Sequence, residues 1–168
     1  MREANMAVRD RDSEGLACGD TVELVQLVRS FIDQTQSVER FHAEIFIDSP
    51  SEMKVQTALG APEWRWIIVQ LLRNCDRAVP ESGPILIGLR DYRNVVVLTV
   101  LDHGSGIEEA LCRRLHEPIS AFDPPEHRSS LLQIKERITK MGGAFQIASQ
   151  IGRGTVVSVH VPKLELRT

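Results

Sequence analysis

Apolar residues recur every three or four positions in three segments, which predicts helices over about 21–35, 62–79 and 130–141. The spacing of Asp20 and Glu23 is that of a capping box and predicts the start of the first helix. Pro62 is suited to the first turn of the second helix, and Gly142-Gly143 ends the third. Residues 108–115 indicate a shorter, fourth helix. The segment 62–79 is the most regular of these, and its apolar stripe contains Trp64, Ile67, Ile68, Leu71, Leu72, Cys75, Ala78 and Val79.

Alternation of inward and outward positions predicts strands at 41–48, 85–89, 145–147 and 155–161. The most apolar run, 95–101, is β-branched and does not alternate, so we expect a strand buried on both faces. Residues 91–94 are turn formers that would join 85–89 to 95–101 in an antiparallel hairpin. Residues 49–62 mix Ser, Pro and Gly, which indicates a loop.

The order of these elements predicts an α/β fold: a two-layer α/β sandwich whose mixed sheet of about five strands has helices on one face. Three connections are helical and two resemble hairpins, which requires both parallel and antiparallel pairs. Residues 116–128 contain adjacent prolines and no clear period, which makes them a candidate lid. Residues 1–19 are poor in apolar side chains and are expected to be a flexible leader to one domain, 20–165.

Composition excludes several classes of protein. With 168 residues, 42% hydrophobic residues and a net charge of −3, the chain is expected to be a globular protein that does not bind nucleic acid. No apolar stretch is long enough to cross a membrane, so we expect a cytoplasmic protein. Three cysteines without Cys-x-x-Cys spacing support neither a disulfide framework nor a zinc site.

The loop that follows the run 95–101 carries the first candidate chemistry. Gly104 and Gly106 allow the backbone to turn sharply and approach a ligand, and Asp102 supplies an acceptor at the mouth of a pocket. Alternatively, Asp102 bonds local amides and the loop is only a turn. A hydrolase triad of Asp102, His103 and Ser105 is excluded, because neighbours in one tight loop cannot converge as acid, base and nucleophile.

A second stripe on the helix 62–79 holds Gln70, Asn74 and Arg77, with Asn74 at the border of the apolar face. The three side chains would face one cleft, although water alone could satisfy the amide of Asn74. Trp66 falls on the polar side of the same helix, where it could face a partner domain.

Four features then stand in one order: Leu71 to Arg77, Asp102 to Ile107, Leu115 to Pro118, and Gly152 to Thr155. This ordered set resembles the ATP-binding (catalytic) domain of sensor histidine kinases. That domain has the Bergerat-type fold of the GHKL superfamily, which also includes gyrase, the large heat-shock chaperones and mismatch-repair ATPases. The resemblance covers about 20–162. The segment 132–138, followed by Gly142-Gly143, is similar to kinases whose last helix carries a Glu-Arg pair.

The resemblance implies ATP and magnesium as cofactors and gives each site residue a role. Asn74 would hold Mg²⁺, Arg77 would face the phosphates, and Asp102 would accept the adenine amino group. Gly104 and Gly106 would shape the pocket floor, and Thr155 would support the adenine. The implied catalytic set is Gln70, Asn74 and Arg77, and the implied nucleotide-binding set also contains Ile107, Ser130 and Leu131.

Four positions depart from the pattern of the resemblance. Gln70 stands where hydrolytic relatives have a glutamate base, and a glutamine cannot take a proton, so fast hydrolysis is not expected. Ser130 and Gln133 replace glycines. Either phosphate binding is weakened, or Ser130 caps the last helix with Gln133 in a capping box while the amides still face the anion. His116 replaces an aromatic residue.

The function implied is an ATP-binding module that donates the γ-phosphoryl group to a histidine on a separate helical domain. None of the five histidines opens a helix in the context of a phosphate acceptor. The expected partners are therefore a histidine-bearing dimerisation domain or a response regulator. We expect no membrane contact by this chain itself, also in the case that it is the cytosolic part of a membrane-bound sensor. The alternative is a degenerate nucleotide-binding or pseudokinase domain that regulates a partner without phosphotransfer. An anti-sigma serine kinase fits the closing Gly142-Gly143 and Gly-Arg-Gly-Thr motifs less well.

Overall fold

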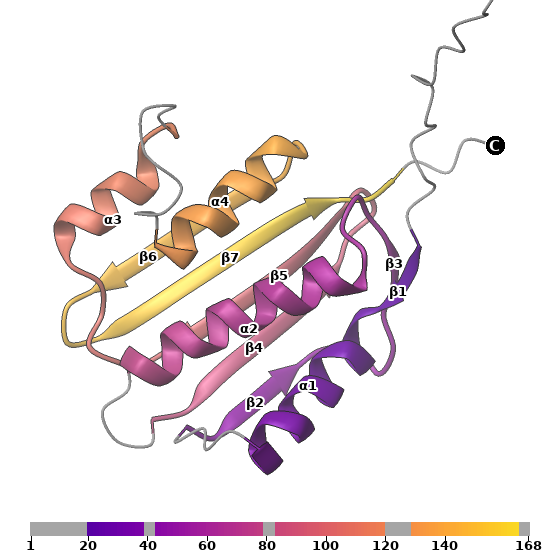
Figure 1. The fold of residues 1–168 in the computed structure, drawn as a ribbon, viewed down its shortest axis with the longest axis horizontal. Helices are drawn as coiled ribbons and strands as arrows, with labels where there is room; N and C mark the ends of the chain where they lie inside the picture. The colour runs from indigo at the N-terminus through magenta and orange to yellow at the C-terminus, as the bar shows by residue number, and fades with distance from the viewer. Residues whose placement is uncertain (1–19, 39–42, 79–82, 120–128, 165–168) are drawn as a thin grey trace, which may run out of the picture.

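The computed structural model describes residues 20–38, 43–78, 83–119 and 129–164, which form two layers (Figure 1). A five-stranded sheet makes one layer, and helices packed on one face of it make the other. The helices are α1 (Leu24–Val38), α2 (Ala61–Ala78), α3 (Glu109–His116) and α4 (Ser130–Lys140). The strands of the sheet are β2 (Ile45–Asp48), β4 (Ile85–Asp91), β5 (Val95–Asp102), β6 (Ala144–Gln150) and β7 (Gly154–Pro162). The predicted two-layer α/β sandwich is confirmed.

The strand order is β2-β4-β5-β7-β6, with β2 parallel to β4 and all other neighbours antiparallel. A parallel pair needs a crossover, and α2 lies in the connection from β2 to β4. The predicted hairpin joins β4 and β5, with Tyr92 N–H donating to the Val95 carbonyl at 2.9 Å. The end of β5 lies beside the start of β7, since Asp102 is in register with Thr155.

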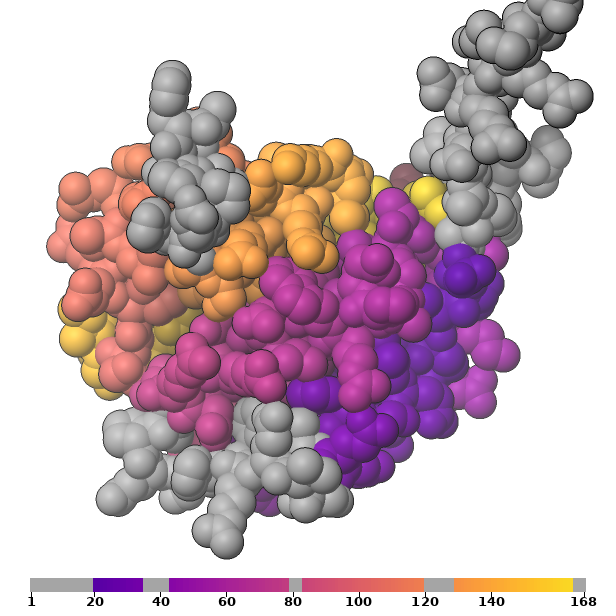
Figure 2. Space-filling view, viewed as in Figure 1, coloured from indigo at the N-terminus to yellow at the C-terminus, as the bar shows by residue number. Residues whose placement is uncertain are grey.

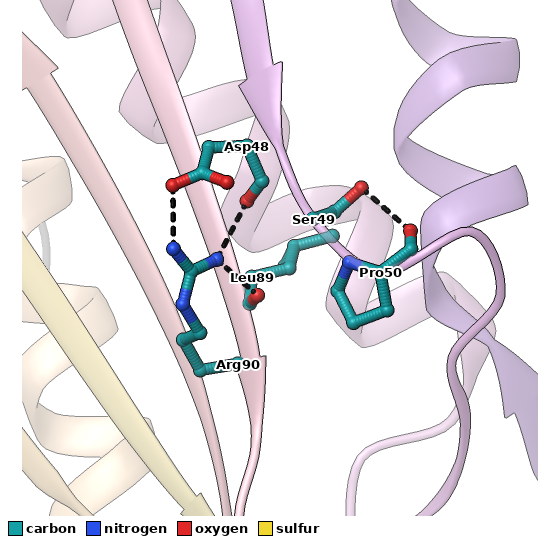
Figure 3. Close-up of polar contacts among 5 residues, drawn as sticks. All are labelled: Asp48, Ser49, Pro50, Leu89 and Arg90. Atoms are coloured by element: carbon teal, nitrogen blue, oxygen red, sulfur yellow. Dashed lines mark hydrogen bonds and ion pairs between the residues drawn. The ribbon is translucent and has the colours of Figure 1, made fainter.

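An ion pair and a hydrogen bond join the parallel strands β2 and β4 (Figure 3). The Arg90 guanidinium donates to the Asp48 carboxylate at 2.5 Å and to the Asp48 carbonyl at 3.0 Å. The ion pair raises the pKa of Arg90, first through the hydrogen bond and then through the charge of Asp48. Ser49 Oγ donates to the Pro50 carbonyl at 3.0 Å just after β2. The bonds from Arg90 therefore connect the last residue of the short edge strand β2 to β4.

Residues 21–23 form a strand, so the prediction that the first helix starts at Thr21 is wrong. This strand, β1 (Thr21–Glu23), pairs antiparallel with β3 (Lys54–Gln56), which lies inside the predicted loop 49–62. Glu23 then caps α1, with its carboxylate accepting from Gln26 N–H at 2.6 Å and from Met53 N–H at 2.5 Å. The predicted capping box is therefore replaced by one glutamate that also ties the helix to a distant loop.

The hydrophobic core lies between the helices and the sheet. α2 contributes the predicted stripe, of which Trp64, Ile67, Ile68, Leu71, Leu72 and Cys75 are buried. The indole N–H of Trp64 donates to Thr57 Oγ1 at 3.2 Å, so its polar atom is satisfied inside the core. Trp66 is half-buried, and the Arg137 guanidinium of α4 lies 4.3 Å from its ring centroid. Trp66 thus contacts its own chain.

The expectation that 95–101 is buried on both faces is wrong. Val96, Leu98 and Val100 are buried, but the alternate residues of β5 are only half-buried because the helices cover one face of the sheet. In the described part of the chain, no helix is both long enough and apolar enough to cross a membrane. The predicted leader, 1–19, and residues 120–128 of the candidate lid lie outside the described residues.

Candidate functional site: a pocket between α2 and α4

A cavity of about 340 Å³ opens between α2, the end of β5, α3 and the first turn of α4. Figure 2 shows α2 (magenta) and α4 (orange) as neighbours on the helix-covered side of the molecule. The lining residues are apolar with a few polar groups: Leu71, Asn74, Cys75, Arg77, Ala78, Val100, Asp102, Gly106, Ile107, Glu108, Leu111, Ser129, Ser130, Leu131, Thr155 and Val157. This mixture is typical of small-molecule sites.

Asp102 is the buried acid of the cavity, with 5% of its surface exposed. Its Oδ1 accepts from Gly104 N–H at 2.8 Å, so the carboxylate bonds a local amide and lines the cavity at once. Burial, followed by the charge of Asp102 and a hydrogen bond to it, raises the pKa of the Cys75 thiol. The thiol therefore stays protonated beside the carboxylate.

Gly106 positions the loop behind this acid. Its φ of +76° suits glycine, and a Cβ there would lie 2.4 Å from the Gln150 carbonyl oxygen at the end of β6. Ser105 on the same loop donates from its N–H to the Ala78 carbonyl at 2.8 Å, at the end of α2. The loop that contains Ser105 and Gly106 therefore packs between the end of α2 and the end of β6, and this position places Ile107 at the cavity wall.

Ser149 in β6 is a residue of this neighbourhood that the sequence reasoning missed. Its hydroxyl accepts from Ile107 N–H at 2.8 Å, donates to the Gly154 carbonyl at 3.1 Å, and lies 2.9 Å from Thr155 Oγ1. One side chain therefore positions two residues of the cavity. The alternation of Phe145 and Ile147 places Ser149 on the same face, and that signal could have identified it.

Asn74 and Ser130 form the other wall, at the junction of α2 and α4. Asn74 Nδ2 donates to Ser130 Oγ at 2.9 Å, and the Ser130 hydroxyl lies 3.1 Å from Asn74 Oδ1. The interpretation of Ser130 as the helix cap is wrong, because Ser129 is the N-cap and its Oγ accepts from Leu132 N–H at 3.3 Å. Arg77, one turn beyond Asn74, is exposed at the cavity wall.

Lys135 fixes the position of α3 relative to α4. Its ammonium group donates to the Leu115 carbonyl at 2.8 Å and to the Glu117 carbonyl, both at the end of α3. Desolvation lowers its pKa, and the charge of Glu117 opposes that shift. Nearby, His116 Nδ1 lies 2.7 Å from the Cys112 carbonyl.

The structure gathers most of the predicted site residues around one cavity. The lining includes eight of them: Asn74, Arg77, Asp102, Gly106, Ile107, Ser130, Leu131 and Thr155. Gly104 lies behind Asp102 and contributes its N–H, and Gln70 is half-buried on α2 outside the lining. The cavity follows the last turns of α2, and Gln70 lies one turn before Asn74.

A divalent cation at this cavity would have few protein ligands. Among the residues that the structure describes, no group of three or more His, Cys, Asp or Glu side chains could hold a metal. Asn74 lines the cavity, and an amide oxygen is a ligand that suits a hard cation, whose remaining ligands would be phosphate and water oxygens. The residues therefore fit a magnesium ion that arrives with a nucleotide, with Asn74 as the protein ligand.

The fold is that of histidine kinase catalytic domains. The catalytic domain of the histidine kinase ThkA matches with a TM-score of 0.68 and 19% identity over 86% of this chain and 97% of that chain. The mycobacterial sensor histidine kinase MprB matches with a TM-score of 0.66 and 16% identity over 88% and 99%. At these identities the likeness shows the fold alone.

Residues 61–165 match the family of histidine kinase-, DNA gyrase B- and HSP90-like ATPases, and the chain belongs to this family. The predicted membership of the GHKL superfamily is confirmed. Histidine protein kinase DivJ of Caulobacter vibrioides is 28% identical over 68% of this chain and 20% of its own length. Sensor histidine kinase DpiB of Escherichia coli is 27% identical over 72% and 23%. The chain thus spans about a quarter or less of the length of these relatives. Both relatives are named as kinases, which does not favour the alternative of a pseudokinase domain.

Proposed function

We propose that this chain is the ATP-binding module of a two-component sensor histidine kinase, which donates the γ-phosphoryl group of Mg-ATP to a histidine on a separate helical domain. One observation carries the proposal: a single cavity joins a buried carboxylate, Asp102, to an amide and a cation, Asn74 and Arg77, at the end of α2. Membership of the ATPase family makes ATP the nucleotide to consider first.

The adenine would lie at the buried end of the cavity. The Asp102 carboxylate can accept a hydrogen bond from an exocyclic amino group, and its burial makes such a charged bond strong. Thr155 presents a hydroxyl beside it, which Ser149 orients through the contact at 2.9 Å. Leu71, Val100 and Ile107 supply apolar walls for the ring.

The phosphates would lie at the other end, near the first turn of α4. The first N–H groups of a helix have no partner within the helix and carry partial positive charge, which favours anions. Ser129 and Ser130 place that turn at the cavity, and Arg77 adds a full positive charge. When bound, Mg²⁺ neutralises charge on the phosphoryl oxygens, and Asn74 is the residue that would hold it.

The phosphate acceptor would come from a separate domain. His103, His116 and His160 lie in a loop, at the end of α3 and in β7, and none of these three lines the cavity. The remaining two, His42 and His127, lie outside the described residues. ThkA, a relative by fold, has been solved in complex with the response regulator protein TrrA. We propose a partner of that kind here, and a cytoplasmic location for the reaction.

Phosphotransfer in trans tests this proposal. The full chain, given radiolabelled ATP and magnesium, should not accumulate acid-labile phosphohistidine, because correct placement of the nucleophile supplies most of the rate in this chemistry. Adding a helical, histidine-bearing dimerisation domain should give label on that domain. Strong labelling of the chain alone at one of its own histidines would contradict the proposed division of roles.

A further inference from the structure

The hydrogen bonds between Asn74 and Ser130 occupy the group that a metal would need. The two residues are 56 positions apart in the sequence, and both are half-buried at the cavity wall. Ser130 Oγ accepts from Nδ2 of the amide at 2.9 Å and can donate its proton to Oδ1 at 3.1 Å. One hydroxyl therefore contacts both ends of the Asn74 carboxamide.

Among the residues that the structure describes, Asn74 is the one hydrogen-bond partner of the Ser130 hydroxyl. The N-cap of α4 is Ser129, which supplies both the side-chain bond to Leu132 N–H and the backbone carbonyl that accepts from Gln133 N–H at 3.1 Å. Removing the Ser130 hydroxyl would therefore leave the cap in place. The contact with Asn74 can be changed without removing the first turn of the helix.

We propose that Ser130 is a positioning residue that holds Asn74 away from magnesium and so weakens the coupling between metal and nucleotide binding. This inference rests on the proposed nucleotide site. Mg²⁺ needs a lone pair of Oδ1 in strict octahedral geometry, whereas the serine proton and the fixed amide direct that oxygen toward α4. Oδ1 has a second lone pair, so the obstacle is the orientation of the amide: the metal binds Asn74 in the fraction of molecules in which the amide has turned from α4 toward the cavity, and its apparent affinity is lowered by that fraction.

The coupling is measured as the ratio of nucleotide dissociation constants without and with saturating magnesium. Calorimetry with a non-hydrolysable ATP analogue, in EDTA and in excess Mg²⁺, gives this ratio without any turnover. Ser130→Ala should raise the ratio about two- to tenfold, as expected for a neutral hydrogen bond. Ser130→Thr keeps a hydroxyl and should restore the ratio of the unmodified protein.

Two further variants separate positioning from a general structural effect. Ser158→Ala deletes a half-buried hydroxyl that pairs with Thr99 Oγ1 at 3.1 Å on the helix-free face, and it should not change the ratio. In an Asn74→Ala background, Ser130→Ala should have no effect on the ratio, because the group that it releases is absent. If Ser130 only supported the structure of α4, Ser130→Ala would change the nucleotide affinity measured in EDTA, both in the unmodified protein and in the Asn74→Ala protein.

The outcomes are distinguishable. An unchanged or smaller ratio in folded Ser130→Ala, while the unmodified chain binds nucleotide, would overturn the positioning role and leave the proposed function intact. If the unmodified chain binds no nucleotide with or without magnesium, the proposed function is wrong and this inference is wrong with it.

Discussion

Asp102, Thr155 and Ser149 form a polar row across three neighbouring strands at one end of an otherwise apolar sheet face. Thr155 is in register with Asp102 on one side and with Ser149 on the other. Buried polar groups are tolerated only when they are hydrogen-bonded, and no buried side-chain polar atom of the described residues lacks a partner. The row is therefore stable without a ligand, and it directs a carboxylate and a hydroxyl at the same cavity.

Cys75 beside this row makes stability depend on pH. Its pKa is raised above the ordinary value of 9.0, so the unfolded thiol loses its proton at a lower pH than the folded one. The thiol's contribution to stability is complete below about pH 9 and is lost above it, by at most about 1.4 kcal/mol per pH unit. In urea titrations between about pH 8 and pH 10, the free energy of unfolding should decline less steeply with pH for Cys75→Ala than for the unmodified protein. Equal slopes in the two proteins would contradict the buried, protonated thiol.

Gly154, the first residue of β7, should be more sensitive to substitution than Gly152 in the turn before that strand. Its φ is +109°, and a Cβ would lie 2.0 Å from the Asp102 carbonyl oxygen, whereas Gly152 has a φ of +76° and nothing within 4 Å. Gly152→Ala should cost about 1–2 kcal/mol of backbone strain. Gly154→Ala should cost more than about 3 kcal/mol, because the strand must also move from β5. Equal losses in chemical denaturation would show that close approach is unimportant here.

At the scale of elements, stripes of apolar residues predicted the helices correctly, but the ends of two helices depended on distant contacts. Thr21–Glu23 matches a helix start locally, yet it pairs with 54–56 and becomes a strand. One interpretation of the sequence made Ser130 the N-cap of α4, whereas Ser129 holds that position. Ser130 instead contacts Asn74 in another helix, and the sequence around the two serines does not show that contact.

Lys135 should stabilise the junction of α3 and α4 more than an exposed lysine of α4 does. Lys135→Met removes the bonds to the carbonyls of Leu115 and Glu117, and we expect a loss of about 1 kcal/mol because the site is partly solvated. Lys140→Met is the matched control, since the Lys140 side chain is exposed and its ion pair with Glu136 is worth less than about 0.5 kcal/mol. Hydrogen exchange should accelerate in α3 only in Lys135→Met. Identical exchange in both variants would show that Lys135 does not fix α3.

At the scale of the whole molecule, the fold class was predictable because helical and hairpin connections together require a mixed sheet. The burial of β5 was not predictable, because a continuous apolar run does not show whether helices cover one face of the sheet or both. Register places one row of apolar residues across the helix-free face, and β5 contributes Leu101 to it; the row is Phe46, Leu86, Leu101, Val156 and Ala148. The expected ATP-site residues came together because the ends of α2 and β5 meet the start of β7 at one edge of the core.

The most direct test of this account is the affinity of the purified chain for ADP with and without the carboxylate of Asp102. Asp102→Asn replaces an acceptor with a group that can present a donor to the adenine amino group, and it should weaken ADP binding at least about tenfold in calorimetry. Asp48→Asn, which alters the exposed pair with Arg90 on β4, is the matched control and should bind ADP normally. Unchanged ADP affinity in a folded Asp102→Asn protein would contradict the assignment of this cavity as the nucleotide site.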